Sequence, residues 1–280
     1  MISVIIPTFR NQELLMNNLH NNLPYLKDCE IIIVNDDPSK SLKEDLKQFK
    51  EIRIIENKKN LGFGESINQG VKIAKGQFLM LLNNDVLLIN NNYQLAINHF
   101  RNNPSLFAVS FAQKEKDGTL VGRNKIYWEK GFFQHKKNDD LKTGPSGWAE
   151  GGSCLIDKKK FLELGGFDKI YAPFYWEDID LSYRARKRGY EILFNREIEV
   201  IHHHESTIGK YFVSNKIKET VFRNQLIFIW KNLTGIKKII EHLYYLLPTI
   251  IKGGWPFFMG FIRALFLLPN IIATPRQKIL

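Results

Sequence analysis

The sequence of 280 residues predicts an α/β fold, a mostly parallel sheet flanked by helices, with a helical region at the C-terminal end. Short apolar runs alternate with segments of helical periodicity over residues 1–115, and polar residues follow most of these runs. Basic and apolar residues dominate after residue 208. With 44% hydrophobic and 25% charged residues, the composition is that of a globular protein and excludes a disordered or fibrous chain.

The first 115 residues contain the elements of the predicted sheet. Four apolar runs are expected to be strands, and they cover residues 3–7, 30–34, 52–55 and 77–82. Helices are expected between them, over residues 12–27, 40–49 and 64–75. Short apolar strands that alternate with helices form a parallel sheet with both faces covered.

Polar residues stand at the carboxyl ends of three of these strands. They are Pro7, Thr8, Asp36, Asp37, Asn83, Asn84 and Asp85. Ligands of parallel sheets bind beyond the carboxyl ends of the strands, so these side chains predict a shared site. Taken singly, each Asp or Asn is equally expected as a turn or cap residue.

Residues 60–70, NLGFGESINQG, form a glycine-rich turn before the third predicted helix. Such a turn can bind phosphate through backbone N–H groups at the helix start. Ile67 occupies the third glycine position of a GxGxxG fingerprint, so that motif is absent. An ordinary turn and helix start would explain the same pattern.

Residues 116–208 are expected to combine loops, short strands and two more helices. The segment 116–147 is rich in turn formers and charges, and 149–156 predicts a turn that enters a strand. Helices are expected over 158–164 and 181–188. A strand followed by a polar loop is expected at the end of this region.

An acidic cluster precedes the second of these helices. Glu177, Asp178 and Asp180 follow the aromatic run Phe-Tyr-Trp at residues 174–176. Asp180 could cap the helix, which explains one carboxylate but not three. Carboxylates beside apolar rings are candidates for a raised pKa and for general-base work.

Three consecutive histidines stand at residues 202–204. Neighbouring side chains of an extended segment point to opposite sides, so the three cannot easily bind one metal ion together. Either one of them is a metal ligand or the run is a polar loop.

The order of these motifs resembles family-2 glycosyltransferases, in particular the rhamnosyltransferase-like branch, over about residues 1–208. The motifs are SVIIPTF, VNDD, NLGFGESINQG, FLMLLNND, AEGGSCLI, GGFD, WEDIDLSYRARKRGY and VIHHHES. The resemblance implies a GT-A (Rossmann-like) fold, with the nucleotide-sugar half in residues 1–115 and the acceptor-binding and catalytic half in 116–208. It implies an inverting enzyme that uses Mg²⁺ or Mn²⁺. Such an enzyme moves one sugar from a nucleotide-diphosphate sugar to a glycan or lipid-linked acceptor in bacterial surface polysaccharide synthesis.

The resemblance also implies roles for single residues. The donor would contact Pro7, Thr8, Asp36, Asp37, Asn60, Gly62, Phe63, Asn68, Asn83, Asn84 and Gly152. Asp178 would be the base with Glu177 beside it, and Trp176 and Asp180 would contact the acceptor. Asp85 would bind the metal ion, with His203 as the expected histidine ligand and His204 as the second choice. Asn83 stands at the first position of the DxD-like motif, which leaves fewer carboxylates for the metal.

The basic excess lies in the C-terminal region. Residues 209–280 contain 11 basic and 2 acidic residues, a net charge of +9 out of the total of +11. The longest uncharged run, residues 264–275, has twelve residues, fewer than the roughly 18–20 that a spanning helix needs. We therefore expect helices that contact the inner leaflet of the membrane through residues 240–280. A helical subdomain packed on the catalytic core is the alternative.

The expected location is cytoplasmic, peripherally attached to the cytoplasmic face of the membrane. Two cysteines are too few for a disulfide scaffold, and the first residues do not have the pattern of a signal peptide. No nucleic-acid partner is expected, because the aromatic residues of the basic region lie within aliphatic runs.

Three alternatives to the one-sugar transferase remain open. A sugar-nucleotidyltransferase would need a basic, glycine-rich loop where this chain has residues 7–11, PTFRN. A non-catalytic membrane-surface binding protein would be expected to have lost Asp85 or Asp178. Processive polysaccharide synthases contain QxxRW, whereas residues 225–230, QLIFIW, lack the arginine.

Overall fold

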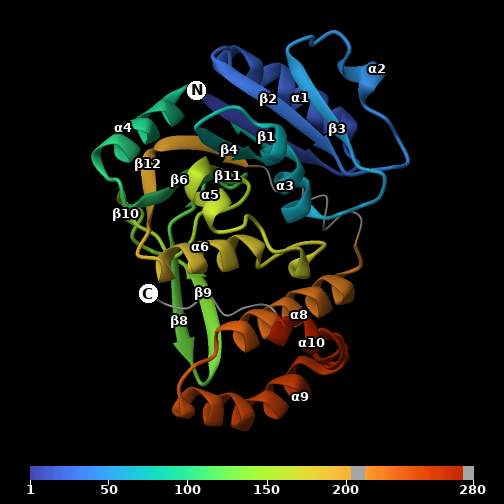
Figure 1. The fold of residues 1–280 in the computed structure, drawn as a ribbon, viewed down its shortest axis with the longest axis vertical. Helices are drawn as coiled ribbons and strands as arrows, with labels where there is room; N and C mark the ends of the chain where they lie inside the picture. Colours follow the sequence, from blue (N-terminus) through green and yellow to red (C-terminus); the bar gives the residue numbers. More distant parts are fainter. Residues whose placement is uncertain (203–211, 274–280) are drawn as a thin grey trace.

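The computed structural model describes residues 1–202 and 212–273, and its centre is a ten-stranded mixed sheet in the order β10-β12-β6-β11-β4-β1-β2-β3 (Figure 1). β5 pairs with β12, and β7 pairs with β6. The strands are β1 (Ile2–Thr8), β2 (Cys29–Asn35), β3 (Ile52–Glu56), β4 (Phe78–Leu82), β5 (Val86–Leu88), β6 (Leu106–Lys114), β7 (Leu120–Val121), β10 (Gly144–Pro145), β11 (Ser153–Asp157) and β12 (Glu191–His202). β1 to β4 are parallel, β6 is parallel to β12, and β11 runs antiparallel between β4 and β6.

Helices cover both faces of the sheet. α1 (Gln12–Asn22) and α4 (Leu95–Asn102) pack on one face, and α3 (Phe63–Ile73), α5 (Lys158–Glu163) and α6 (Glu177–Lys187) pack on the other. Neighbouring residues of one strand serve opposite faces: Val4 packs with the first group and Ile5 with the second. Each such fully buried aliphatic side chain contributes about 1.5–3 kcal/mol. The short helical elements are α2 (Lys43–Leu46), η1 (Leu23–Tyr25), η2 (Asn92–Gln94) and η3 (Lys169–Tyr171).

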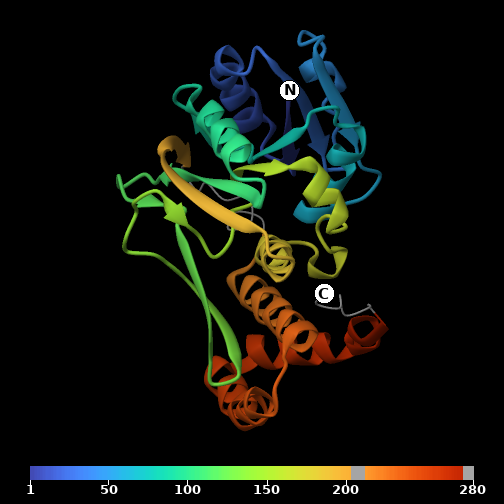
Figure 2. The same ribbon diagram turned by 60° about the vertical axis from the view of Figure 1, so that its left-hand side comes forward.

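A second hydrophobic core lies beside the sheet. It joins α6 to the hairpin β8 (Asn124–Glu129) and β9 (Phe132–Lys137) and to three C-terminal helices (Figure 2). These helices are α8 (Ser214–Asn232), α9 (Ile236–Phe266) and α10 (Leu268–Ala273). Polar contacts tie the hairpin to the helices, because Gln225 donates to the carbonyl of Phe133 at 3.0 Å and Nδ1 of His242 lies 3.0 Å from the carbonyl oxygen of Gly131. Trp230 of α8 donates to His242 of α9 at 3.1 Å and joins the two helices.

α9 is long and bent. Gly254 has a φ of 65°, which breaks the helix, and Pro248 and Pro256 stand on either side of it. Among the residues that the structure describes, no helix combines the length and the apolarity needed to cross a membrane. The C-terminal region is therefore helical, as predicted, and its helices pack partly on the hairpin and on α6.

Some predicted boundaries differ from the structure. The first helix ends at Asn22 because Pro24 follows, and the chain tightens there into η1. The helix expected over residues 40–49 is only α2, a single turn with one buried residue, Leu46. The sequence analysis assigned no element to β6, whose apolar run is buried on both faces and has no clear period.

Candidate functional site

A cavity of about 260 Å³ lies at the carboxyl ends of β1, β2 and β4. Nine residues predicted for donor or metal binding line it: Pro7, Thr8, Asp36, Asn60, Gly62, Phe63, Asn83, Asn84 and Asp85. His202, one of the three histidines considered as a metal ligand, also lines the cavity. The other lining residues were not predicted for the site, and they are Phe9, Ser66, Pro173, Phe174, Tyr175 and Phe212. The strand ends thus meet at one edge of the sheet, as the parallel arrangement predicts.

Hydrogen bonds between β1 and the turn after β4 shape the floor of this cavity. The amide of Asn84 donates to the hydroxyl of Thr8 at 2.8 Å, and Asn18 of α1 donates to the carbonyl of Asn84 at 2.8 Å. Arg10 and Asn11, which follow β1, both have left-handed backbones with φ near 56°. Such residues are uncommon outside glycine and gather at functional sites. Hydrogen bonds within the protein therefore hold the residues at the ends of β1 and β4 in place.

Asp36 and Asp37 have different surroundings. The carboxylate of Asp36 accepts hydrogen bonds from the backbone N–H groups of Leu61 and Gly62 and from Asn57, each at 2.8 Å. Burial raises the pKa of Asp36, although these donors act in the opposite direction. Asp37 instead caps a turn through the backbone and hydroxyl of Ser39. The structure therefore places Asp36 on the cavity and Asp37 in the turn beside it.

The glycine-rich turn and the segment before α6 form one wall. Gly62 has a φ of 83°, and a Cβ atom there would lie 2.6 Å from the carbonyl oxygen of Pro173. The N–H of Phe63 donates to the same carbonyl at 3.0 Å. Tyr175 and Trp176 both have positive φ angles, 68° and 79°. The wall that faces the cavity is thus a strained segment held against the turn.

Glu177 and Asp178 open α6 directly behind this wall. The oxygens of Asp178 accept from the backbone N–H of Gly151 at 3.3 Å and of Ile179 at 2.8 Å. Burial, together with the charge of Glu150, raises the pKa of Asp178 to about 6. Burial and the neighbouring Asp178 raise the pKa of Glu177 well above its ordinary value. Neither carboxyl group lines the 260 Å³ cavity.

One oxygen of Glu177, Oε2, is buried without a hydrogen-bond partner among the described residues. A void of about 10 Å³ lies beside Glu177, against Gly64, Pro173 and Tyr171. That volume is about the size needed for one water molecule. Among residues 1–202 and 212–273, neither Glu177 nor Asp178 forms an ion pair with a basic side chain.

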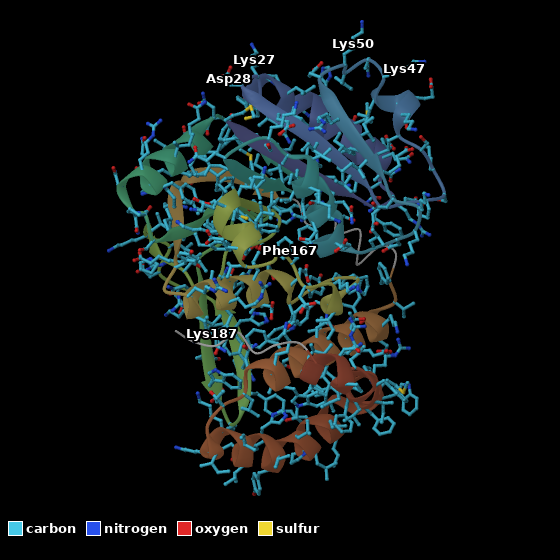
Figure 3. The ribbon with its side chains drawn as sticks, in the orientation of Figure 1. Lys27, Asp28, Lys47, Lys50, Phe167 and Lys187 are labelled. Carbon is cyan, nitrogen blue, oxygen red and sulfur yellow. The ribbon has the colours of Figure 1, made fainter. Side chains whose placement is uncertain are left out.

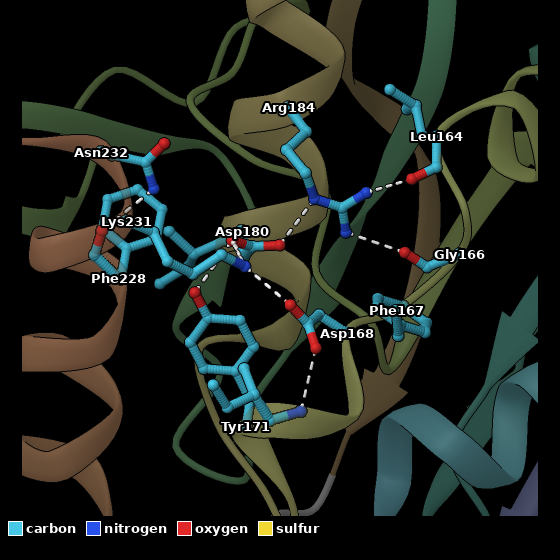
Figure 4. Close-up of polar contacts among 12 residues, drawn as sticks. Leu164, Gly166, Phe167, Asp168, Tyr171, Asp180, Arg184, Phe228, Lys231 and Asn232 are labelled. Atoms are coloured by element: carbon cyan, nitrogen blue, oxygen red, sulfur yellow. Dashed lines mark hydrogen bonds and ion pairs between the residues drawn. The ribbon is translucent and has the colours of Figure 1, made fainter. Parts of the chain in front are cut away.

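Asp180 lies in a buried ion-pair cluster (Figure 4). Its carboxylate contacts Arg184 at 2.7 Å and Lys231 at 3.0 Å and accepts from the hydroxyl of Tyr171 at 2.9 Å. Burial alone would raise the pKa of Asp180, but the two cations hold it below its ordinary value. Asp168 shares Lys231 at 2.7 Å. The structure therefore gives Asp180 a part in joining α6 to α8, away from the cavity.

Two predicted contact residues, the buried Trp176 and the half-buried Asn68, contact other parts of the protein and do not line the cavity. Trp176 is buried between the rings of Phe133, Phe228 and His135, with centroids 5.3–6.3 Å away. Asn68 accepts from the backbone N–H of Phe167 at 3.0 Å and donates to its carbonyl at 2.8 Å.

Phe167 is buried inside the molecule, whereas Lys27 and Lys50 project from the surface at one end of the molecule (Figure 3). Gly152 contacts the cavity only indirectly, since its carbonyl accepts from the N–H of Asn83 at 2.9 Å.

A histidine does reach the end of the DxD-like motif, and it is His202. Its Nε2 lies 3.1 Å from Oδ1 of Asp85, and both side chains are buried. His203 and His204, the predicted ligands, lie outside the described residues. A signal for His202 was present, because Ile198, Val200 and His202 alternate inward along β12.

Asp85 and His202 fit a divalent cation in spacing and chemistry. Ligands at neighbouring corners of an octahedron with bonds of about 2.1 Å are about 3.0 Å apart, close to the observed 3.1 Å. Within residues 1–202 and 212–273, no group of three or more His, Cys, Asp or Glu side chains could hold an ion. Mg²⁺-type sites commonly use one or two protein ligands and complete the shell with phosphate and water.

Comparison with known proteins shows which family and which curated proteins the sequence is similar to. The sequence model of the family described as Glycosyl transferase family 2 matches residues 3–165. The poly-beta-1,6-N-acetyl-D-glucosamine synthase of Staphylococcus aureus (strain COL) is 25% identical over 199 residues. These residues are 69% of this chain and 47% of that protein, so the chain spans about half the length of this curated relative.

Solved structures show the same fold. GalNAc-T7, solved with UDP, GalNAc and Mn²⁺, has a TM-score of 0.63 at 18% identity, with 82% of this chain and 47% of that chain covered. The mannosyltransferase PcManGT of Pyrobaculum calidifontis, solved with GDP-Man and Mn²⁺, has a TM-score of 0.56 at 14% identity, with 98% and 75% covered. At these identities the likeness shows the fold alone, and the predicted GT-A class is confirmed.

Proposed function

The chain belongs to glycosyl transferase family 2, and from this premise we propose that it moves one sugar from a nucleotide-diphosphate sugar to a hydroxyl group of a glycan or lipid-linked acceptor, with inversion. The observation that carries the proposal is the cavity that joins Asp36, the glycine-rich turn and the Asp85–His202 pair at one edge of the sheet. We assign the nucleotide to the side of Thr8 and Asp36. We assign the diphosphate to the side of Asn84 and Asp85.

Inversion is a single displacement. The acceptor oxygen forms the new bond to the anomeric carbon while the bond from that carbon to the diphosphate oxygen breaks. We propose that the acceptor proton goes to the carboxylate of Asp178, whose pKa of about 6 suits a base near neutral pH. A divalent cation, when bound by Asp85 and His202, would neutralise charge on the leaving diphosphate.

The base assignment is tested by Asp178→Asn. Positioned proton transfer typically contributes about 10²–10⁴-fold, so kcat should fall by that factor while donor binding stays. The reaction is followed by release of the nucleoside diphosphate, and donor binding by calorimetry. Asp139→Asn, an exposed acid in the loop after the hairpin, is the matched control and should keep full activity. Turnover of Asp178→Asn within tenfold of the unmodified protein would refute the assignment.

A processive synthase is the second candidate, because the curated relative is named as a synthase of a polymer. Gln225 and Trp230 are five positions apart, whereas the Gln and Trp of the QxxRW motif of processive enzymes are four positions apart. Gln225 bonds to the hairpin, and Trp230 donates to His242 and packs near Phe261. Both therefore support the packing of the C-terminal helices, which favours transfer of one sugar. Mass spectrometry of the products distinguishes a single addition from a ladder.

We also propose that the protein acts at the cytoplasmic face of a membrane, docked through α9. Of the seventeen large apolar side chains that are exposed among the described residues, eleven lie on this helix. Six of them fall on one face at helical spacing before the break at Gly254, and Trp255 follows directly after it. These seven residues are 59–72% exposed: Ile236, Ile240, Leu243, Tyr244, Leu247, Ile251 and Trp255. We call these seven residues the α9 face. Its position at one end of the molecule leaves it open to a surface (Figure 1).

The charges around the α9 face favour an anionic bilayer over a second copy of the chain. α9 carries Lys237, Lys238, Lys252 and Arg263 but only one acid, Glu241. Two such helices would repel each other, whereas each basic residue near an anionic lipid surface contributes about 1 kcal/mol of attraction. Trp255 and Tyr244 are of the type that favours the headgroup level.

Vesicle flotation tests this docking. The protein should float with vesicles of phosphatidylcholine and phosphatidylglycerol and much less with phosphatidylcholine alone. The triple variant Leu243→Ser, Leu247→Ser and Ile251→Ser should stay behind, and Leu162→Ser, an exposed leucine on α5, should float normally. Substitutions are preferable to deletion, because α9 also supplies Ile250 and Ala264 to the second core. Flotation of the triple variant, or its conversion from a dimer to a monomer, would contradict the proposal.

A further inference from the structure

A row of hydrogen bonds leads from the hairpin to Asp85. Asn124 at the start of β8 donates to one oxygen of Glu150 at 2.9 Å, and Gln113 of β6 donates to the other at 2.5 Å. The oxygen of the Gln113 amide lies 2.6 Å from Nδ1 of His202. His202 Nε2 then faces Asp85 at 3.1 Å. Glu150 and Gln113 do not line the cavity, so this row approaches the Asp85–His202 pair from behind.

Glu150 and Gln113 leave one arrangement of protons on the Nδ1 side of His202, whereas Nε2 on the other side of the ring faces the carboxylate of Asp85. An ionised carboxylate has no hydrogen to donate, so Glu150 requires the NH₂ group of Gln113 to face it. The amide oxygen of Gln113 must then face His202, and an oxygen at that place requires the proton on Nδ1. In the neutral ring, Nε2 consequently presents its lone pair on the side of Asp85.

Gln113 alone could not impose this choice. A side-chain amide can turn over and exchange its oxygen and nitrogen with little change in shape. With the NH₂ group toward His202, the ring would hold its proton on Nε2, and a protonated nitrogen cannot bind a metal ion. The carboxylate of Glu150 excludes this second arrangement. The side chain of Gln113 is almost completely buried, so no bulk solvent competes for its amide.

We propose that Glu150, acting through Gln113, is a positioning residue that sets the tautomer of His202 so that Nε2 can bind the divalent cation. The proposal rests on the proposed function in taking that cation as the ion at Asp85. The tautomer itself is a property of the metal-free protein and can be measured without donor, acceptor or activity.

The experiment uses the full chain with ¹⁵N-labelled histidine and two variants of the row. Glu150→Leu removes the carboxylate and lets the amide of Gln113 turn. The exchange of Gln113→Glu with Glu150→Gln restores an acceptor for Nδ1–H, because the transferred carboxylate receives both the ring N–H and the new amide. Glu115→Gln is the matched control, since Glu115 is two residues from Gln113 but pairs with Lys137 at 2.8 Å. It tests whether loss of any nearby negative charge has the same effect.

In the unmodified protein, the ¹⁵N spectrum of the neutral His202 ring should show the proton on Nδ1. Glu150→Leu should shift the ring toward Nε2–H and weaken Mn²⁺ binding, measured by electron paramagnetic resonance, by about 10–100-fold. The exchanged pair should recover both, and Glu115→Gln should change neither. Wild-type Mn²⁺ affinity in folded Glu150→Leu, or Nε2–H in the unmodified protein, would overturn the proposal. Nδ1–H in a protein that does not bind Mn²⁺ would instead contradict the metal assignment of the proposed function.

Discussion

The carboxyl groups near the cavity differ in what surrounds them, and this decides what each can do. Asp36 accepts three hydrogen bonds from the glycine-rich turn and Asn57, so it organises that turn. Glu177 is buried beside a second acid, and burial together with the charge of Asp178 raises its pKa well above its ordinary value. The pKa of Asp178 is also raised, to about 6. Asp178 is therefore the carboxyl group that can exchange a proton near neutral pH.

The pH dependence of turnover follows from this value. Asp178 acts as a base only when it is ionised, so kcat should fall about tenfold per pH unit below about 6 and level off above. The profile should be measured as nucleoside diphosphate release between pH 4.5 and 8, and its inflection belongs to the pair Glu177–Asp178. An inflection near the ordinary value for an aspartate, about 4, would show that Asp178 is not the base.

The contribution of Asp178 to folding stability should fall as the pH rises, whereas turnover should increase. A pKa raised on folding favours the protonated form, so its stabilising contribution is present below about pH 4 and is lost as the pH rises through about 6. Asp178→Asn removes this loss. The variant should therefore gain in Tm relative to the unmodified protein as the pH is raised from 4 to 8, although it is less active. A Tm difference that stays constant over this range would contradict the raised pKa.

At the residue scale, sequence alone located the site but not the exact ligands. Asp36 and Asp37 are equivalent in the motif, and only the hydrogen bonds to Leu61 and Gly62 show which of them faces the cavity. The choice among His202, His203 and His204 depends on strand parity, which in turn depends on where β12 ends. Hydrogen bonds connect Glu150, in the loop before β11, through Gln113 of β6 to His202 of β12, and no spacing in the sequence indicates these contacts.

At the scale of elements, α8 holds the segment that forms one wall of the cavity through hydrogen bonds and ion pairs. Its Asn224 donates to the carbonyls of Tyr171, Phe174 and Tyr175 at 2.7–3.0 Å. Two turns further along α8, Lys231 reaches Asp168 and Asp180. The strained segment before α6 is therefore held by a helix that lies outside the family match at residues 3–165.

Asn224→Ala tests whether α8 holds the segment before α6 in place. The change removes the amide donor that the carbonyls of Tyr171, Phe174 and Tyr175 share, and among the described residues only Tyr171 keeps another contact, at 3.5 Å from Arg223. This loss should cost about 1–3 kcal/mol in the free energy of unfolding, measured in urea. Because the released segment contains Pro173 and Tyr175 of the cavity wall, KM for the donor should rise as well. Asn224→Asp keeps the volume but has no donor, and it should be at least as damaging.

Gln225→Ala is the matched control for this helix. Gln225 is the next residue, and it bonds to Phe133 of the hairpin rather than to the cavity wall. Its loss should lower stability without changing KM for the donor. Equal effects of the two variants on KM would mean that α8 has only a general structural role.

Elements with clear periodicity were predictable and others were not. β1, β2, β3 and β4 lie within a residue or two of the predicted runs, because their apolar residues are bounded by turn formers. β6 was missed, since a run buried on both faces has no alternation. In the part of the chain that the structure describes, the hairpin β8–β9 pairs with no other strand. Its position depends on the second core, which local sequence patterns do not reveal.

At the scale of the whole molecule, the two hydrophobic cores support different parts of the site. The sheet core supports the nucleotide end, and the second core joins the hairpin, α6 and the C-terminal helices. The segment that carries Trp176 to Asp178 lies between them and is held by both (Figure 1). On the proposed function, docking of the α9 face would bring this boundary close to an acceptor that stays in the membrane.

The central claim is that the cavity binds a nucleotide-diphosphate sugar with a divalent cation at Asp85, and thermal shift tests it most directly. UDP-, dTDP- and GDP-linked sugars are added with and without Mn²⁺ to the unmodified protein and to Asp85→Ala. A donor at a hundredfold its Kd should stabilise the fold by about 2.7 kcal/mol, which means a rise in Tm of several degrees. The account predicts such a rise for one nucleotide, only with Mn²⁺, and its loss in Asp85→Ala. The same rise without Mn²⁺ and in Asp85→Ala, or no rise with any donor, would contradict it.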